Sequence, residues 1–165
     1  MVVLRRTRKL SALLPDSGAV LPPSDTALGD WYVNRLVVDR QPLLLLVSSA
    51  TLLPILIPAR VVRSLPDRLA GIVEARLRRC GIEASVIRAE IKAMSSVAVG
   101  STVDRSVLGI LVDFAKCVPF HLESGQWDER MLPAVEARLA ETPCYASGPD
   151  RGVIFPERKA PEVLR

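Results

Sequence analysis

Arg105 and Asp113 are two of the few charged residues in the largely apolar stretch 95–123, and their spacing suggests a shared surface. With Gly109 between them, they recur four residues apart, which places them on one face of a helix. An arginine in the first turn of a helix can hold an anion together with the N–H groups of that turn. The alternative is a solvated charged face behind a core helix, because charged side chains mostly lie at the surface.

The segments around this pair predict a strand, a polar turn and an amphipathic helix. Residues 95–101 alternate apolar and small side chains, which is typical of a half-buried strand. Asp104 stands where a helix N-cap is expected, and Pro119 should end or kink the helix. The face predicted to pack on a sheet carries Leu108, Leu111, Val112 and Ala115.

We also predict that Arg105 pairs with a carboxylate outside its own helix. A cation in the first turn opposes the helix dipole, so an acidic partner from elsewhere should offset it. The candidates within the chain are Asp30 and Asp39 of the predicted hairpin, and the alternative is an anion from outside the protein.

Composition limits the classes of function. The 165 residues are 49% apolar, 24% charged and 4% aromatic, with a formal net charge of +4. Few aromatic residues argue against a protein that stacks nucleic-acid bases, although the basic excess permits contact with nucleic acid. The densest basic cluster is Arg5, Arg6, Arg8 and Lys9, which we interpret as a solvated edge strand. Nucleic-acid binding by this cluster is the weaker alternative.

Evidence for catalysis in the sequence is slight. The three cysteines are far apart and show no paired spacing typical of zinc sites or disulfide frameworks. Cys117 and the only histidine, His121, are four residues apart and would suit nucleophilic or metal chemistry only with further partners. No phosphate-binding glycine loop or hydrolase motif is present. We therefore assign no catalytic residue, metal ligand or cofactor.

The order of elements predicts an α+β fold with a mostly antiparallel sheet of about four or five strands packed against several helices. Residues 30–38 and 43–48 form its central hairpin, with a turn at 39–42. Trp31 and Asn34 stand at the mouth of this hairpin and Asp39 at its turn. A tryptophan here is more often part of the core than a platform for a ligand. We predict one domain over residues 1–146 and an irregular tail over 147–165.

No segment has the length and composition of a signal peptide or a membrane span. We therefore expect a cytoplasmic protein without membrane contact. The sequence leaves its oligomeric state open.

Several short motifs resemble those of a family of small bacterial proteins catalogued as a domain of unknown function. They are Asp30-Trp31-Tyr32-x-Asn34, Asp39-Arg40, Thr102-x-x-Arg105-Ser106-Val107-Leu108-Gly109, Asp113, and Glu141-Thr142-Pro143. The resemblance implies no activity. It does imply that Arg105, Ser106, Asp113, Trp31 and Asn34 belong to one shared surface.

Two hypotheses of different classes follow. The first is a non-catalytic module that binds another bacterial protein, antitoxin-like or regulatory and associated with a mobile element. The second is a small enzyme, or an anion- or nucleotide-binding protein, that uses Arg105 and Asp113 together with Asp39.

Overall fold

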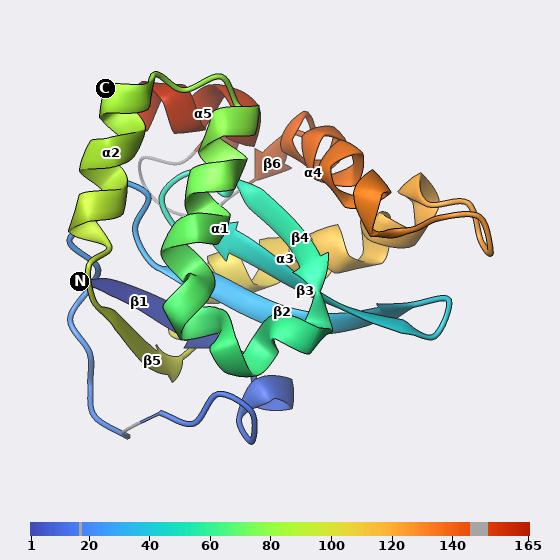
Figure 1. The fold of residues 1–165 in the computed structure, drawn as a ribbon, viewed down its shortest axis with the longest axis horizontal. Helices are drawn as coiled ribbons and strands as arrows, with labels where there is room; N and C mark the ends of the chain where they lie inside the picture. Colours follow the sequence, from blue (N-terminus) through green and yellow to red (C-terminus); the bar gives the residue numbers. More distant parts are fainter. Residues whose placement is uncertain (17, 146–151) are drawn as a thin grey trace.

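The central sheet contains five strands in the order β4-β3-β2-β1-β5 (Figure 1). The computed structural model describes residues 1–16, 18–145 and 152–165. β2, β3 and β4 are antiparallel neighbours, whereas β1 pairs in parallel with both β2 and β5. The strands of this sheet are β1 Val2–Arg6, β2 Trp31–Val38, β3 Gln41–Ser48, β4 Pro54–Pro58 and β5 Val97–Ser101.

The α+β class is confirmed, but the sheet is mixed and not mostly antiparallel as predicted. Parallel neighbours cannot be joined by a tight turn, so each needs a long crossover. Residues 7–30 carry the chain from β1 to β2, and two helices carry it from β4 to β5. Because both pairings join segments distant in sequence, no local pattern signals them.

The hairpin of β2 and β3 turns on two residues. Asp39 and Arg40 have φ angles of 50° and 65°, and Val38 pairs directly with Gln41. Two successive residues with positive φ form the turn whose twist matches that of a hairpin. The turn is therefore shorter than the predicted 39–42, and β3 starts at Gln41.

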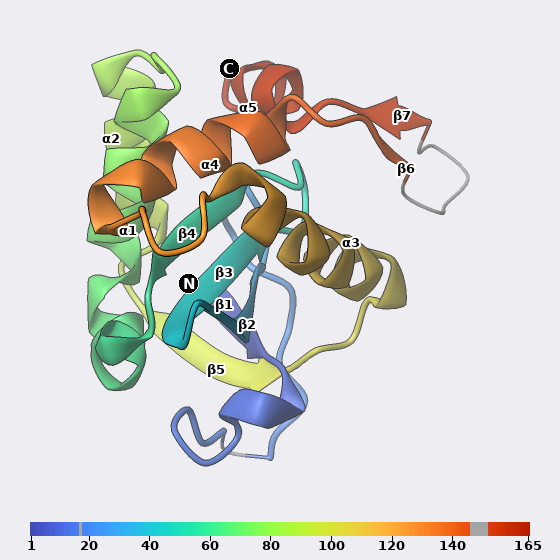
Figure 2. The same cartoon turned by 90° about the vertical axis from the view of Figure 1, so that its right-hand side faces the viewer.

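The sheet is buried on both faces. In β3, Leu44 and Leu46 belong to the core cluster on one face, and Leu43 and Leu45 to the cluster on the other. Helices α1 (Leu65–Arg79) and α2 (Ala84–Ala93) cover the first face, and α3 (Arg105–Cys117) covers the second (Figure 2). This explains why β3 is apolar at successive positions, as expected of a central strand.

Asp104 caps α3 as predicted, accepting hydrogen bonds from the backbone N–H groups of Ser106 and Val107. The buried face of α3 differs from the prediction. Leu111 is buried and Val112 is 38% exposed, while Leu108 and Ala115 are only partly buried. The residues that fill this face are Val107, Ile110, Leu111 and Phe114. The helix is therefore rotated relative to the prediction, so that Ile110 and Phe114 face the sheet in place of Val112 and Ala115.

Helix α4 (Leu132–Ala140) protects the β4 edge of the sheet. Its Glu136 is 1% exposed and accepts a hydrogen bond from the backbone N–H of Leu56 at 2.9 Å. Arg76 donates to the Pro54 carbonyl at 2.9 Å and lies 3.4 Å from the Glu136 carboxylate. Side chains thus satisfy backbone groups that an exposed edge would offer to other chains.

The short elements complete the described chain. They are η1 Arg8–Leu10, η2 Ala59–Ser64, η3 Val118–His121, η4 Glu129–Met131, β6 Cys144–Tyr145, β7 Val153–Ile154 and α5 Pro156–Val163. The predicted irregular tail 147–165 therefore contains β7 and α5, while its residues 147–151 lie outside the described part. Ala160 and Leu164 join the core on the α1 side. Among the described helices, none combines the length and hydropathy needed to span a membrane.

Candidate functional site

The loop 102–104 joins β5 to α3 and presents one apolar side chain to solvent. Val103 is 68% exposed. The next residue is Asp104, whose backbone N–H donates to the Tyr32 hydroxyl at 2.9 Å. The carboxylate of Asp104 caps α3. Tyr32 itself is 1% exposed and lies in the core beneath α3. The exposed valine is therefore held next to a rigid anchor on the sheet.

Val103 lies between two grooves, one of which we call the Arg105 groove. It has a volume of about 360 Å³, and Arg8 and Arg105 supply its exposed cations. Its lining residues are Thr7, Arg8, Thr102, Val103, Asp104, Arg105 and Leu108. They come from the carboxyl ends of the parallel strands β1 and β5 and from the start of α3, the kind of place where open sheets commonly bind ligands.

The second groove, the Arg5 groove, has a volume of about 450 Å³. Arg5 and Asp30 line it and form a buried ion pair, with Nε 2.8 Å from Oδ2 and side-chain exposures of 7% and 10%. Ser24 donates to the other Asp30 oxygen through its N–H at 3.0 Å and its hydroxyl at 2.6 Å. Val20, which is fully exposed, lines the same groove as Val103.

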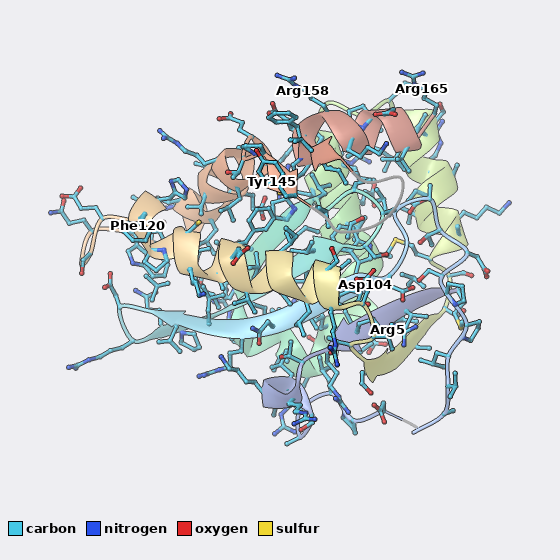
Figure 3. The ribbon with its side chains drawn as sticks, turned by 180° about the vertical axis from the view of Figure 1, so that it is seen from behind. Arg5, Asp104, Phe120, Tyr145, Arg158 and Arg165 are labelled. Carbon is cyan, nitrogen blue, oxygen red and sulfur yellow. The ribbon has the colours of Figure 1, made fainter. Side chains whose placement is uncertain are left out.

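We call Val103, the Arg105 groove and the Arg5 groove together the Val103 surface. Figure 3 shows one residue from each groove, Arg5 and Asp104, near the same end of α3. Its charge is unbalanced. Asp30 neutralises Arg5, and Asp16 neutralises Arg6 next to it at 2.8 Å. Arg8 and Arg105 are exposed, and neither forms an ion pair within the described residues. Asp104 is the one carboxylate among the described residues that line the same groove, so one positive charge remains in excess. The surface therefore favours acidic groups.

Three of the predicted site residues lie at or under this surface. Arg105 lines its groove, and Ser106 is the next residue, with its N–H held by the Asp104 cap. Asn34 is buried and accepts a hydrogen bond from the Thr7 hydroxyl at 2.7 Å, directly beneath the groove. Asn34 thus supports the groove without lining it.

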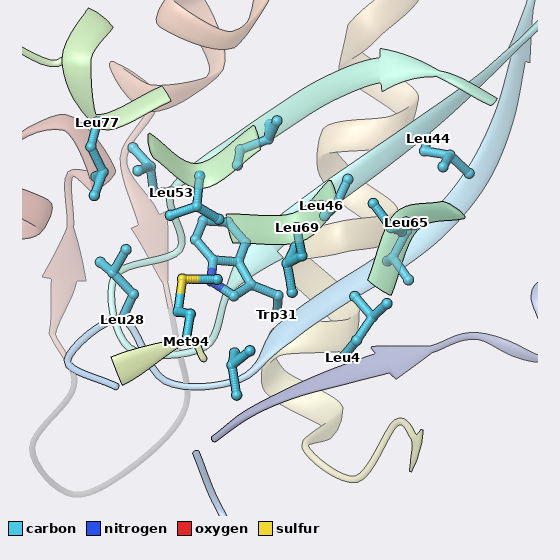
Figure 4. Packing of buried hydrophobic residues seen from close by; sticks show 14 of the residues in the cluster. Leu4, Leu28, Trp31, Leu44, Leu46, Leu53, Leu65, Leu69, Leu77 and Met94 are labelled. Carbon is cyan, nitrogen blue, oxygen red and sulfur yellow. The ribbon is translucent and has the colours of Figure 1, made fainter. Parts of the chain in front are cut away.

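Trp31 lies elsewhere. Its side chain is 0% exposed and packs in the α1-side core, on the face of the sheet opposite α3. Figure 4 shows its ring among Leu28, Leu69 and Met94. Its indole N–H has no hydrogen-bond partner in the described structure.

Asp39 also lies elsewhere, at the tip of the β2–β3 hairpin. It accepts hydrogen bonds from the Ser124 hydroxyl, the Gly125 N–H and the Trp127 indole, at 2.8 to 3.0 Å. These hydrogen bonds lower the pKa of Asp39 below its ordinary value, and the bond from Gly125 has the largest effect. The carboxylate therefore fastens the hairpin to the loop before α4.

The predicted pairing of Arg105 with a hairpin carboxylate is wrong. Asp30 bonds to Arg5, and Asp39 bonds to the loop that contains Gly125. No ion pair joins Arg105 to any residue in the described ranges. The unfavourable interaction between this arginine and the helix dipole is offset instead by the carboxylate of Asp104, the N-cap residue immediately before it.

Asp113 is exposed on α3, two turns beyond Arg105, and lines neither groove. Burial raises the pKa of the Cys144 thiol to about 11, and the negative charge of Asp113 makes a smaller contribution in the same direction. A thiol with so high a pKa is a poor nucleophile at neutral pH. No cluster of three or more His, Cys, Asp or Glu side chains that could hold a metal occurs in residues 1–16, 18–145 and 152–165.

Sequence reasoning missed Arg5, Arg8 and Val103 as site residues. The basic cluster at 5–9 was visible, but its interpretation as a solvated edge strand is wrong, because β1 lies between β2 and β5. The one available signal was that Arg5 falls among apolar residues in a strand, where a charge needs a partner.

A family model matches residues 3–159, nearly the whole chain. The chain belongs to the family described as Domain of unknown function (DUF6933). The DUF6933 match includes the whole Val103 surface and agrees with the resemblance to a small family without assigned function. No curated protein and no solved structure matches the chain.

Proposed function

We propose that this protein is a non-catalytic binding module that engages another protein through the Val103 surface. The observation that carries the proposal is the 68% exposed Val103 between two grooves, with two exposed arginines on one side that form no ion pair to any described residue. Interfaces typically combine a central apolar contact with arginines, which are enriched there.

The rigid mounting of the loop supports this proposal. The Tyr32 hydroxyl fixes Asp104 on one side of Val103, and an Arg5 Nη1 contact of 3.4 Å reaches the Ser101 carbonyl on the other. Thr7 is held by Asn34 at the floor of the Arg105 groove. A surface that is already ordered loses less conformational entropy on binding.

The excess of Arg8 and Arg105 favours a partner with acidic side chains. In one version of this proposal, the protein is an antitoxin-like or regulatory partner of another bacterial protein whose gene lies next to its own on a mobile element. Co-purification of the product of that neighbouring gene would support this version.

The direct test is affinity capture of partners from cells of the source organism, followed by titration of the purified partner. Val103→Ser and Arg105→Glu should each weaken binding without lowering Tm, and the charge reversal at Arg105 should do so by at least about ten-fold. Val37→Ser and Arg88→Glu are matched controls, because both residues are exposed and lie outside the two grooves. Equal loss in the controls, or none in the site variants, would reject this surface.

Anion or nucleotide binding is the second candidate, because Arg8 and Arg105 face one groove at the ends of parallel strands. In this candidate function Arg8, and not Asp113, would act together with Arg105, because Arg8 lines the groove and Asp113 does not. Asp104 opposes this function, because its carboxylate already occupies the N–H groups of Ser106 and Val107. Calorimetric titration with orthophosphate and with a nucleoside triphosphate tests it, and Arg105→Ala should abolish any heat of binding.

A further inference from the structure

Two large apolar side chains are exposed together at the other end of α3. Phe120 in η3 is 89% exposed, and Met131 at the end of η4 is 43% exposed. Both line a groove of about 370 Å³, together with His121, Ala134, Val135 and Arg138. Figure 3 shows Phe120 at one end of α3 and Asp104 at the other, so this Phe120 groove is separate from the Val103 surface.

The segment that carries Phe120 is anchored two residues away on each side. Val118 is 0% exposed and Leu122 is 8% exposed, and both belong to the α3-side core. The Leu122 N–H also donates to the Pro119 carbonyl at 3.3 Å. A short helix anchored on both sides directs its middle side chain outward. Exposed aromatic residues on an ordered backbone contribute strongly to binding at protein interfaces.

Among the described residues that line this groove, the one with a formal charge is positive, and it is Arg138. The nearest acidic residues along η4 are already engaged, since Asp128 pairs with Arg130 at 2.8 Å and Glu129 pairs with Arg60. Arg138 forms no ion pair with any described residue. An occupant of complementary charge would therefore be acidic.

From this geometry we infer that the Phe120 groove binds a short segment of a second protein in which an aliphatic or aromatic anchor lies next to Asp or Glu. The anchor would pack between Phe120 and Met131, and the carboxylate would pair with Arg138. Phe120 and Met131 supply apolar contact of the kinds enriched at interfaces, and Arg138 supplies bidentate donors. This site requires nothing from the Val103 surface, so each can fail without the other.

The test uses short random peptides displayed on phage and selected on the immobilised full chain, with the Phe120→Ser variant as the counter-target. Enriched peptides should carry a Leu, Phe or Trp flanked by Asp or Glu. A synthetic copy should bind at least about ten-fold more weakly to Phe120→Ser, Met131→Ser and Arg138→Glu, and equally well to Val103→Ser. Because Phe120 is 89% exposed, its replacement should leave Tm unchanged.

The inference is overturned by any of three results. The first is no enrichment over the Phe120→Ser counter-target. The second is enriched peptides without acidic residues. The third is peptide binding that Val103→Ser removes while Phe120→Ser retains it, which would move the site to the Val103 surface.

Discussion

The Tyr32 hydroxyl lies 2.9 Å from the backbone nitrogen of Asp104 and accepts its hydrogen bond. This single contact joins the middle of the sheet to the residue that caps α3. Burial raises the pKa of Tyr32, so the hydroxyl stays protonated at neutral pH. The bond therefore sets where Val103 and Arg105, on either side of Asp104, lie relative to the strands.

Replacing Tyr32 by Phe removes this bond and leaves the ring in place. Loss of this bond should lower the free energy of unfolding by about 1 kcal/mol, the usual worth of a neutral hydrogen bond. Urea denaturation measures this change. Tyr145→Phe is the control, because Tyr145 is 76% exposed, and an equal loss there would show that the Asp104 contact is unimportant.

Glu136 is the shared counter-ion of Arg76, at 3.4 Å, and Arg79, at 2.8 Å, and the side chains of Glu136 and Arg76 are at most 5% exposed. Glu136→Gln keeps the size and the acceptor for Leu56 but leaves Arg76 buried without its charge partner. Removing one member of a buried pair costs about 3–5 kcal/mol, so we expect a loss in that range by urea denaturation. Glu141→Gln, an exposed position, should change stability by no more than about 0.5 kcal/mol. Comparable effects of the two changes would contradict the role given to Glu136.

The orientation of α3 can be tested at two adjacent positions. Leu111 is 0% exposed and Val112 is 38% exposed. Leu111→Ala should lower the free energy of unfolding by about 2–5 kcal/mol through lost burial and the cavity left behind. Val112→Ala should cost less than about 1 kcal/mol. If Val112→Ala is the more damaging change, the helix face described here is wrong.

Asp39 makes the contact between the hairpin tip and the loop 124–127 dependent on pH. Its pKa is lower in the folded state than the ordinary value of 3.8, because Gly125, Ser124 and Trp127 donate to the carboxylate. The stabilisation is therefore complete above the ordinary pKa and is lost as the pH falls through the lower, folded-state pKa. The NMR resonance of the Trp127 indole N–H should shift in that acidic range.

The Trp31 indole, which is buried and without a partner in the described structure, provides an internal reference that should not follow the same titration. In Asp39→Asn the residue no longer titrates, so the Trp127 transition should disappear. A Trp127 profile unchanged by Asp39→Asn would assign the transition to another group.

Local patterns predicted much of the fold. The hairpin followed from two strands around Asp39-Arg40, and the start of α3 from the capping side chain of Asp104. Both depend on residues close together in the chain. The parallel pairing of β1 with β2 and β5 depends on segments 25 or more residues apart and on no turn motif, so it was not predictable in the same way.

The candidate site was predicted less well than the fold. Arg105 was identified because a cation in the first helical turn needs an explanation, and it does line a groove. Arg8 and Val103 were missed, because only the parallel pairing of β1 with β5 brings the ends of these strands together. Trp31 was placed on the shared surface by the resemblance, whereas it lies in the core, which is the more common place for a tryptophan in a strand.

The most direct test of the Val103 surface is photo-cross-linking in cells of the source organism, with a photoreactive amino acid placed at position 103. Position 88, exposed on α2, serves as the control. Our proposal predicts a discrete cross-linked protein at position 103 that is absent at position 88 and is lost when Arg105→Glu is added. No adduct at position 103, the same adduct at both positions, or an adduct unaffected by Arg105→Glu would contradict it.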